Sequence, residues 1–512
     1  MERAFCRSIA AFVLAAMVVI TSSPAHAIGG GDSFVVTEDP FDVHHRYQPL
    51  PGELDIGTLE KTLVWKGVNR SVTTPILIED LDGDGLREIV FGLATGKVIA
   101  LEIATNETIL EIKMTDVAIQ DLVVGNVDGD DEDEIIFTSA EGIYCYDFGK
   151  EKLKWSNPME ILHSEINLVM TGSKEDNPIK HQIVLLWSEG SYYSGAHNHV
   201  ARFTGNGDVR WSTDLLPLLH GNGPYASSLI LDLDGDGELE VFVNDYGWSA
   251  RGLLGNVRNI WILNATSGAL TKSMSLGQTY FYSRPMPLIV NDETYVVIGL
   301  NQPNKAPDLL IYNGSSGSHR FVDVHSATDV AFWEFLAFFP GPSGGTMVLS
   351  RQLWTIHAFS WDEPSVNGTY DVESRGLDVN PVVCDIDGDG VVEILAPGDG
   401  IWIIDSESML PEAQITPEQL EGVHSRTTNI RLTVADVDED QRSEVIFGYY
   451  DDTGTETSYI FLLGGLDDQM EDGTPTQGRA IGWSIILFVV GANIVLIAVL
   501  LRDWRRQGEE DI

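Results

Sequence analysis

The sequence predicts an all-β fold, a β-propeller of about eight four-stranded blades (seven are also compatible), and three observations support it. A nine-residue acidic motif occurs five times, each time followed by a short apolar strand. The motifs begin at residues 80, 126, 232, 385 and 436, and the intervals of 46, 106, 153 and 51 residues are close to multiples of one unit. Alternating strands and polar turns follow, which indicates hairpins. Four antiparallel strands per unit are typical of a propeller blade.

The N-terminus has the features of a secretory signal. Arg3 and Arg7 precede an apolar run over residues 9–20, and Ala25-His26-Ala27 has the small residues of a cleavage site. The apolar run is too short to cross a bilayer. We therefore expect the signal to be removed on export.

The acidic motifs predict calcium sites. Each has oxygen-bearing side chains at positions 1, 3, 5 and 9, and carboxylates packed this closely repel one another unless a cation lies between them. Hard oxygen ligands in a flexible loop suit Ca²⁺, and the loops lack the soft ligands that favour zinc or copper. We expect up to five Ca²⁺ ions; an acidic turn without metal is the alternative, because Asp-Gly is itself a turn signal. The predicted ligands are Asp80, Asp82, Asp84, Glu88, Asn126, Asp128, Asp130, Glu134, Asp232, Asp234, Asp236, Glu240, Asp385, Asp387, Asp389, Glu393, Asp436, Asp438, Asp440 and Glu444.

The five motifs are not identical. Position 6 is glycine in three of them, which allows a sharp backbone turn. Asp131 and Gln441 replace it in the second and fifth motifs, so we expect those two sites to be strained or weaker. An EF-hand is excluded, because it needs a glutamate at position 12, where all five sequences have an apolar residue.

The long intervals contain three units without the motif. Their apolar strands lie within residues 165–190, 285–300 and 340–350, where we expect blades without metal. Aromatic residues are frequent in and beside these units and are candidates for partner recognition, although packing between blades is the favoured explanation. Residues 61–65 resemble an outer strand and the last unit lacks one, so we expect them to complete the final blade and close the ring.

The first motif, Asp80-Leu-Asp-Gly-Asp-Gly-Leu-Arg-Glu88, and its strand, Ile89-Val-Phe-Gly92, resemble the FG-GAP repeat. This repeat builds the propellers of integrin α-subunits and of related surface proteins of bacteria and archaea. The resemblance extends over residues 60–465. It implies seven or eight blades, with calcium in the loop that joins the first two strands of a blade.

The C-terminal region predicts a membrane anchor. Residues 480–501 are 22 uncharged, mostly apolar residues, enough for one transmembrane helix. Arg502, Arg505 and Arg506 follow and place this end in the cytoplasm. We expect a single-pass type I protein of the cell membrane with its large domain outside. The predicted division is a signal peptide at 1–27, an N-terminal segment at 28–59, the propeller at 60–465, a flexible stalk at 466–479, the transmembrane helix at 480–501 and a tail at 502–512.

Charge and cysteine content exclude several classes of protein. The formal net charge of −46 argues against nucleic acid or anionic lipid as a partner held by charge. Cys145 and Cys384 are the only cysteines after the signal, so a disulfide scaffold is excluded and unpaired buried thiols are expected. Glycosylation and plain turn chemistry explain the sequons equally well; these are at Asn69, Asn106, Asn264, Asn313 and Asn367.

Together these features favour a membrane-anchored, calcium-binding propeller at the cell surface. We expect it to act in adhesion or in binding an extracellular protein or glycan, with calcium structural. We expect no enzyme, because no convincing catalytic constellation stands out and the acidic pairs belong to the loops. The alternatives are a quinoprotein-like or polysaccharide-active propeller enzyme, suggested by Val209-Arg-Trp211, and an assembly factor of a surface complex. His197-Asn-His199 fits surface histidines better than a metal site.

Overall fold

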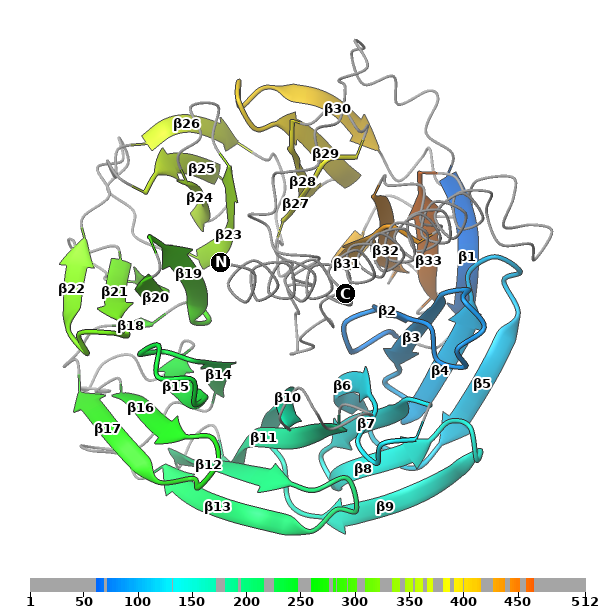
Figure 1. Cartoon of the computed structure of the whole chain (residues 1–512). Coiled ribbons are helices and arrows are strands. Elements are labelled where there is room, and N and C mark those ends of the chain that lie inside the picture. The colour runs from blue at the N-terminus through cyan, green and yellow to red at the C-terminus, as the bar shows by residue number, and fades with distance from the viewer. Residues whose placement is uncertain are drawn as a thin grey trace, which may run out of the picture.

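A computed structural model (Figure 1) describes residues 61–464 except for short stretches. Those stretches are residues 69–70, 131, 172–179, 192–194, 216–224, 247–258, 276–279, 282, 292, 302–308, 323–333, 341–345, 353–354, 362–365, 372–380, 387–390, 399, 416–426, 438–442 and 452–456. The predicted signal, N-terminal segment, stalk, transmembrane helix and tail therefore lie outside the described residues. Among the residues that the structure describes, no helix is long and apolar enough to cross a membrane.

The described strands form eight antiparallel sheets, which Figure 1 shows as blades around one central axis. The prediction of an all-β propeller is confirmed, with eight blades rather than seven. Blade 1 consists of β2 (Leu77–Glu79), β3 (Glu88–Gly92), β4 (Lys97–Glu102) and β5 (Thr108–Lys113), and blade 2 consists of β6 (Ile119–Gly125), β7 (Glu134–Ser139), β8 (Gly142–Asp147) and β9 (Lys152–Pro158). Blade 3 consists of β10 (His163–Thr171), β11 (Lys180–Ser191), β12 (Gly195–Phe203) and β13 (Val209–Leu215). Blade 4 consists of β14 (Tyr225–Leu231), β15 (Glu240–Tyr246), β16 (Asn259–Asn264) and β17 (Leu270–Ser275).

The remaining four blades complete the ring. Blade 5 consists of β18 (Tyr280–Phe281), β19 (Met286–Val290), β20 (Glu293–Asn301), β21 (Leu309–Asn313) and β22 (His319–Val322), and blade 6 consists of β23 (Glu334–Pro340), β24 (Thr346–Gln352), β25 (Thr355–Ser360) and β26 (Val366–Asp371). Blade 7 consists of β27 (Val382–Cys384), β28 (Glu393–Gly398), β29 (Gly400–Asp405) and β30 (Pro411–Ile415). Blade 8 consists of β31 (Thr427–Ala435), β32 (Glu444–Asp451), β33 (Thr457–Leu463) and β1 (Lys61–Val68). Blades 3, 5 and 6 are the three predicted units without an acidic motif.

The N-terminal strand closes the ring. β1 pairs antiparallel with β33 in blade 8, with Lys61 opposite Leu463 and Val68 opposite Thr457. The expectation that residues 61–65 complete the final blade is confirmed. Blade 8 therefore takes three strands from the end of the propeller sequence and one from its start, which removes an open sheet edge.

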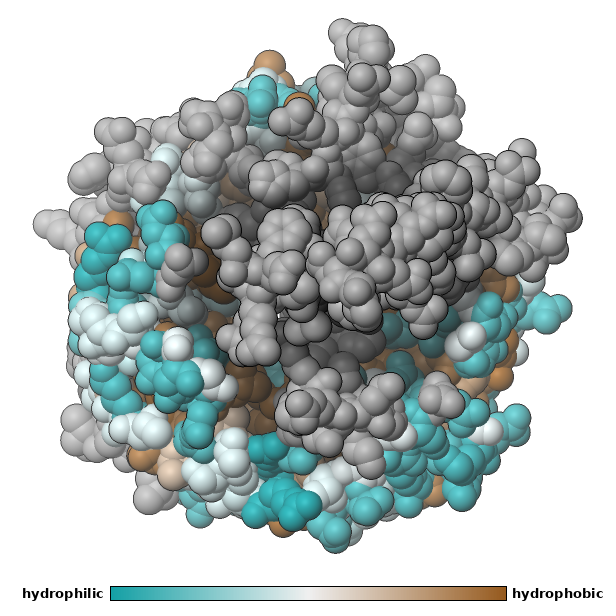
Figure 2. Space-filling model, in the orientation of Figure 1, coloured by the Kyte–Doolittle hydropathy of each residue, from teal (hydrophilic) through white to brown (hydrophobic). Residues whose placement is uncertain are grey.

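The second strand of a blade is buried where the outermost strand is not. β3 and β7 are buried along their whole length, because neighbouring blades cover both of their faces. Core clusters accordingly join two blades, as where Leu81 of blade 1 packs with Phe137 of blade 2. The outermost strands β5 and β9 mix exposed and half-buried residues, and Figure 2 shows mostly hydrophilic side chains over this part of the rim.

The outermost strand carries a one-residue bulge at an equivalent register in six of the blades that the structure describes. In blade 2 the register shifts opposite Cys145 and Tyr146, and Lys154 is the extra residue of β9. The extra residues of blades 1 and 4 are Ile109 and Thr271. A bulge changes the direction in which a strand presents its side chains.

Candidate metal centres

The five acidic motifs occupy equivalent loops. Each joins the first strand of its blade to the second, in blades 1, 2, 4, 7 and 8, as the repeat predicted. We refer to them as loops 1 to 5, at residues 80–88, 126–134, 232–240, 385–393 and 436–444. Because equivalent connections of propeller blades lie at the same end of the ring, the five loops lie at one end.

The glutamate at position 9 is buried and fixed in the same way in every loop. Its Oε2 accepts a hydrogen bond from the backbone N–H of position 2. The distances are 2.7 Å from Leu81 to Glu88, 2.8 Å from Val127 to Glu134, 2.9 Å from Leu233 to Glu240, 2.9 Å from Ile386 to Glu393 and 2.7 Å from Val437 to Glu444. A buried carboxylate needs such a donor. The bond orients the carboxylate and leaves Oε1 as the oxygen that it can offer to a cation.

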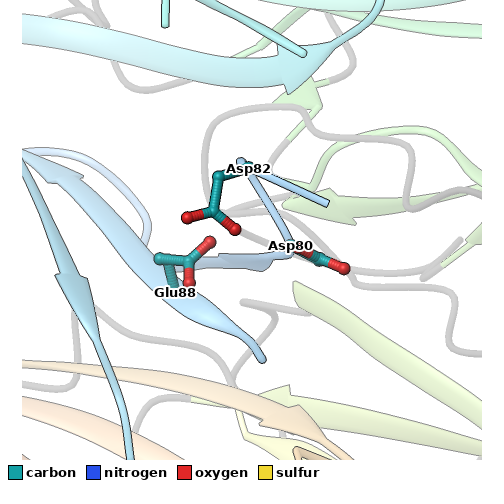
Figure 3. A group of neighbouring side chains, drawn as sticks. All are labelled: Asp80, Asp82 and Glu88. Atoms are coloured by element: carbon teal, nitrogen blue, oxygen red, sulfur yellow. The ribbon is translucent and has the colours of Figure 1, made fainter. Parts of the chain in front are cut away.

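Loops 1 and 3 bring three carboxylates together. One oxygen each from Asp80, Asp82 and Glu88 lies within 4.8 Å of the other two, and Figure 3 shows Asp82 and Glu88 turned toward each other. Loop 3 repeats this arrangement at positions 1, 3 and 9. Calcium binds oxygen at about 2.3–2.6 Å, so that ligands on opposite sides of the ion are about 5 Å apart. The converging oxygens therefore have a spacing that fits Ca²⁺.

Backbone hydrogen bonds shape the rest of these loops. Asp80 accepts from Gly83 N at 2.8 Å and from Gly85 N at 3.0 Å, and both glycines have a positive φ, of 74° and 91°. At position 5, Asp84 Oδ1 accepts from Leu86 N at 2.7 Å. Asp84 and its counterpart Asp236 are not among the three converging groups of their loops. The three converging groups are thus positions 1, 3 and 9 of the predicted ligand set, and position 5 is not one of them.

The electrostatics of loops 1 and 3 favour a bound cation. Burial raises the pKa of Glu88 to about 8, and the neighbouring aspartates add to the shift. Burial and then the three aspartates of loop 3 likewise raise the pKa of Glu240, against the opposing bond from Leu233 N. A carboxylate with a raised pKa is unfavourable in its charged form, and a cation between the groups would relieve this repulsion. The donor set and its spacing both fit Ca²⁺.

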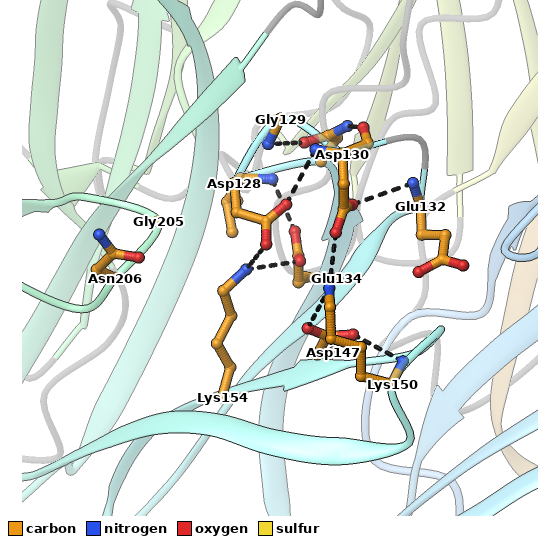
Figure 4. A network of polar contacts seen from close by, with 12 residues as sticks. Asp128, Gly129, Asp130, Glu132, Glu134, Asp147, Lys150, Lys154, Gly205 and Asn206 are labelled. Carbon is orange, nitrogen blue, oxygen red and sulfur yellow. Dashed lines mark hydrogen bonds and ion pairs between the residues drawn. The ribbon is translucent and has the colours of Figure 1, made fainter.

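Two lysines from the end of blade 2, Lys150 and Lys154, lie among the acidic groups of loop 2 (Figure 4). Lys154 Nζ contacts Asp128 Oδ2 and lies 2.8 Å from Glu134 Oε1. Lys150 Nζ lies 2.7 Å from Asp130 Oδ2 and 3.0 Å from Asp147 Oδ2. Burial alone would raise the pKa of Asp128, but the hydrogen bond and charge of Lys154 hold it below its ordinary value. Loop 2 is therefore already neutralised in part by side chains of its own blade.

Loops 4 and 5 are described only in part. Asp385, Glu393, Asp436 and Glu444 lie within the described residues. The predicted ligands at positions 3 and 5 of these loops lie outside them; these are Asp387, Asp389, Asp438 and Asp440. What is established there is the glutamate at position 9 with its bond from position 2.

The loops also contact the following blade. A Cβ at Gly205 of blade 3 would lie 1.9 Å from the carbonyl oxygen of Val127, and one at Gly314 of blade 5 would lie 1.8 Å from that of Leu233. Only glycine permits such a close approach. His181 N of blade 3 also donates to Asn126 O at 2.8 Å. The conformation of loops 2 and 3 is therefore coupled to the packing of one blade on the next.

Two tryptophans fasten neighbouring blades together. Trp155 Nε1 donates to Gly205 O at 2.8 Å, and Trp211 Nε1 donates to Ala265 O at 3.1 Å. Their rings lie so close to Gly207 and Gly268 that a Cβ there would be 2.7 Å and 2.4 Å away. The Val209-Arg-Trp211 segment is thus engaged in packing between blades.

The other candidates from the sequence are engaged locally. His199 stacks on Trp187 at 4.9 Å and lies 2.8 Å from Asp214 and 3.3 Å from Glu189. Cys145 and Cys384 are buried and unpaired, as expected. Asn264 and Asn313 accept hydrogen bonds from the turn serines, Ser267 N at 2.9 Å and Ser316 N at 2.7 Å, as turn chemistry predicts.

One sequence motif falls outside the described residues. Residues 341–345 read Gly-Pro-Ser-Gly-Gly and match the pattern of a nucleophilic serine, Gly-x-Ser-x-Gly. That motif needs a turn from a strand into a helix. The element that follows here is strand β24, so the structural context of a nucleophile is not met.

Sequence reasoning missed two buried carboxylates on the innermost strands. Asp121 on β6 accepts from Ile166 N of blade 3 at 2.7 Å, and Glu165 on β10 accepts from Ser228 N of blade 4 at 3.2 Å. Burial raises the pKa of Asp121 to about 7, with Glu165 adding to the shift and Arg284 opposing it. The sequence signal that could have identified each of them was a single acidic residue within an otherwise apolar strand. These groups link blades 2, 3 and 4 near the axis.

Comparison with known proteins identifies no family for this chain. No protein-family model matches the chain, and no curated protein matches it either. Among solved structures, BamB from Moraxella catarrhalis is 15% identical with a TM-score of 0.47, covering 78% of this chain and 99% of that one. The Dos1 propeller is 8% identical (TM-score 0.48, 80% and 97% covered), and a europium-containing methanol dehydrogenase is 10% identical (TM-score 0.49, 81% and 95% covered). The FG-GAP resemblance remains a prediction.

Proposed function

We propose that this protein is a calcium-stabilised β-propeller, anchored in the cell membrane, that serves as an adhesion module or a binding module for an extracellular protein or glycan. The observation that carries the proposal is the convergence of the carboxylates at positions 1, 3 and 9 in loops 1 and 3. When bound, Ca²⁺ would neutralise these groups. Its ligands would be Asp80, Asp82 and Glu88 in loop 1, and Asp232, Asp234 and Glu240 in loop 3.

The calcium has a structural role in this proposal. Each loop connects the innermost strand to a fully buried strand, and loop 3 also contacts blade 5 through Leu233 O and Gly314. Neutralising the loop therefore stabilises both a blade and its packing on the next. Loops 4 and 5 have the same sequence pattern and the same glutamate bond, so we extend the proposal to them.

A calcium titration tests the metal part of the proposal. The full-length chain, purified in a mild detergent because its sequence predicts a membrane span, is melted with excess Ca²⁺, with Mg²⁺ or with chelator. We expect the melting midpoint to be highest with Ca²⁺, because Mg²⁺ demands stricter octahedral geometry. Variants Asp82→Asn and Asp234→Asn should each bind one Ca²⁺ ion fewer. An unchanged midpoint together with unchanged calcium content would overturn this part.

The surface role is supported by the predicted signal, the predicted span and the strongly acidic composition. Protease treatment of intact cells tests it: an epitope in the propeller should be removed, whereas one after residue 512 should be protected. Liposomes carrying the full-length chain should then bind a panel of immobilised glycans or whole cells in Ca²⁺ and lose binding in chelator. A propeller epitope protected in intact cells would contradict the proposal.

The enzyme alternative was suggested by the segment Val209-Arg-Trp211 and stays a prediction. The Trp211 indole, in the segment that suggested a quinoprotein-like repeat, donates to Ala265 O of the next blade. An absorption spectrum of the purified chain is the simplest check on this alternative, since a bound quinone absorbs at wavelengths where the protein alone does not.

A further inference from the structure

We propose that Lys154 is an internal counter-ion that takes the place of the metal in loop 2, so that blade 2 is held together without Ca²⁺. The ammonium group touches Asp128 at position 3 and lies 2.8 Å from Glu134 at position 9. Loops 1 and 3 direct their converging oxygens from these same positions, whereas the converging oxygens of blade 2 belong to Asp128, Glu134 and Asp147, without the residue at position 1. The inference rests on the proposed calcium sites in loops 1 and 3, and it assigns a different occupant to loop 2.

The bulge in β9 explains why the lysine reaches the loop. Lys154 is the extra residue of the bulge, and its side chain is 13% exposed. The extra residues at the equivalent register of blades 1 and 4 are Ile109 and Thr271, which carry no charge. Among the loops described at positions 1, 3 and 9, loop 2 is therefore the one whose outermost strand offers a cation from this position.

Two lysines of blade 2 supply to the acids of loop 2 the positive charge that one divalent ion would bring. Four carboxylates are in contact with the lysines: those of Asp128 and Glu134 with Lys154, and those of Asp130 and Asp147 with Lys150. The two ammonium groups supply the same charge of +2 that one Ca²⁺ ion would supply. A calcium ion entering loop 2 would have to displace a mostly buried ammonium from two carboxylates, which would lose charge-assisted hydrogen bonds.

The residue at position 1 of loop 2 also supports the inference. Asn126 stands where loops 1 and 3 have an aspartate, so the loop has one negative charge fewer at this position. Its Oδ1 accepts from Gly129 N at 2.6 Å, and its Nδ2 donates to Asp130 O. In loops 1 and 3 the second oxygen of the aspartate accepts from the position-6 N–H at 3.0 Å. An amide nitrogen cannot accept there, so loop 2 is built differently from a calcium loop.

Bound calcium per chain gives the first test. We measure it by elemental analysis after dialysis of the full-length chain against buffer with micromolar free Ca²⁺. Asp128→Asn should leave the number unchanged, whereas Asp82→Asn and Asp234→Asn should each remove one ion. The double variant Asn126→Asp/Lys154→Ile, which has at these two positions the residues found in blade 1, should bind one ion more. The reciprocal Thr271→Lys should remove the ion of loop 3. Loss of an ion in Asp128→Asn would overturn the inference, and unchanged content in Asp82→Asn and Asp234→Asn would instead overturn the proposed function.

A second measurement does not depend on what loops 1 and 3 bind. Melting midpoints of Lys154→Met, Glu134→Gln and the double variant are compared in chelator. If Lys154 neutralises Glu134, the two single losses are not additive, and the double variant melts no lower than the worse single one. Lys113→Met, which removes the lysine of an exposed pair with Asp116, is the matched control and should leave the midpoint unchanged. Strictly additive losses would overturn the inference.

Discussion

Blades 1 and 2 are neighbours and contain the same nine-residue loop frame, yet different groups lie against its acids. Loop 1 has four carboxylates at positions 1, 3, 5 and 9 and is contacted by no lysine among the described residues. Loop 2 has an asparagine at position 1 and lysines 150 and 154 against its acids. Both loops keep the same bond from position 2 to the glutamate at position 9. The motif therefore fixes the shape of the loop, whereas residues some twenty positions further along the chain supply the lysines that contact its acids in blade 2.

Removal of calcium should reveal the largest difference in stability between blades 1 and 2. Each occupied loop stabilises the fold by about 2.7 kcal/mol when free Ca²⁺ is a hundredfold above Kd. Chelator should therefore lower the melting midpoint and increase amide exchange in β3 and β15. Exchange in β7, behind loop 2, should respond least. Hydrogen exchange read out by mass spectrometry measures this, and an equal response of β3 and β7 would break the comparison.

The innermost strands extend the comparison to pH. Burial raises the pKa of Asp121 on β6 in blade 2 to about 7, and it raises the pKa of Glu79, at the end of β2 in blade 1, to about 7 as well. The folded-state pKa of Asp121, about 7, lies above its ordinary 3.8, so the stability that this group contributes is present below pH 4 and is lost as pH rises through about 7.

Asp121→Asn should therefore stabilise the protein at pH 8, by at most about 4 kcal/mol for a shift of about three pKa units. The amide oxygen can still accept from Ile166 N. Glu165 and Arg284 face the same group and remain as in the native protein. Melting midpoints at pH 5 and pH 8 measure the effect; a variant that is equally destabilised at both would show that the charge of Asp121 costs nothing.

A substitution at position 6 should have a smaller effect on stability, and it tests whether the glycine at this position distinguishes loop 3 from loop 2. Gly237 of loop 3 has a φ of 89°, and a Cβ there would meet no atom within 4 Å, whereas loop 2 has Asp131 at this position. Gly237→Asp should cost about 1–2 kcal/mol, since only the backbone conformation is unfavourable. It should also weaken calcium binding by loop 3. Calcium titration of the variant measures this, and unchanged affinity would mean that glycine at position 6 is not what distinguishes the loops.

The smallest effect concerns the outer lysine of loop 2. The side chain of Lys150 is 45% exposed against 13% for Lys154, so solvent screens its pair with Asp130 more than the pairs of Lys154. Lys150→Met should therefore lower the melting midpoint less than Lys154→Met does. A reversed order would show that the outer lysine is the one that holds the loop.

Local patterns were sufficient to predict the ring and the place of its loops. The acidic motif marks the turn between two strands by its own residues, and the outer-strand character of residues 61–65 identified the closing strand. Lys154 could not be found in this way, because its contact with Glu134 depends on a bulge whose register is set by pairing with β8. Asp121 and Glu165 gave no motif, because their partners are backbone groups of the next blade.

The pairing of Lys61 with Leu463 has a consequence for the time course of synthesis. Blade 8 cannot be completed until about 400 further residues have been made, which takes about 20–80 s at about 5–20 residues per second. During that interval the earlier blades can form while β1 waits without its neighbour. The nascent ring is then an open arc with two bare strand edges, so a partner that covers such edges, such as a chaperone, would act during synthesis rather than afterwards.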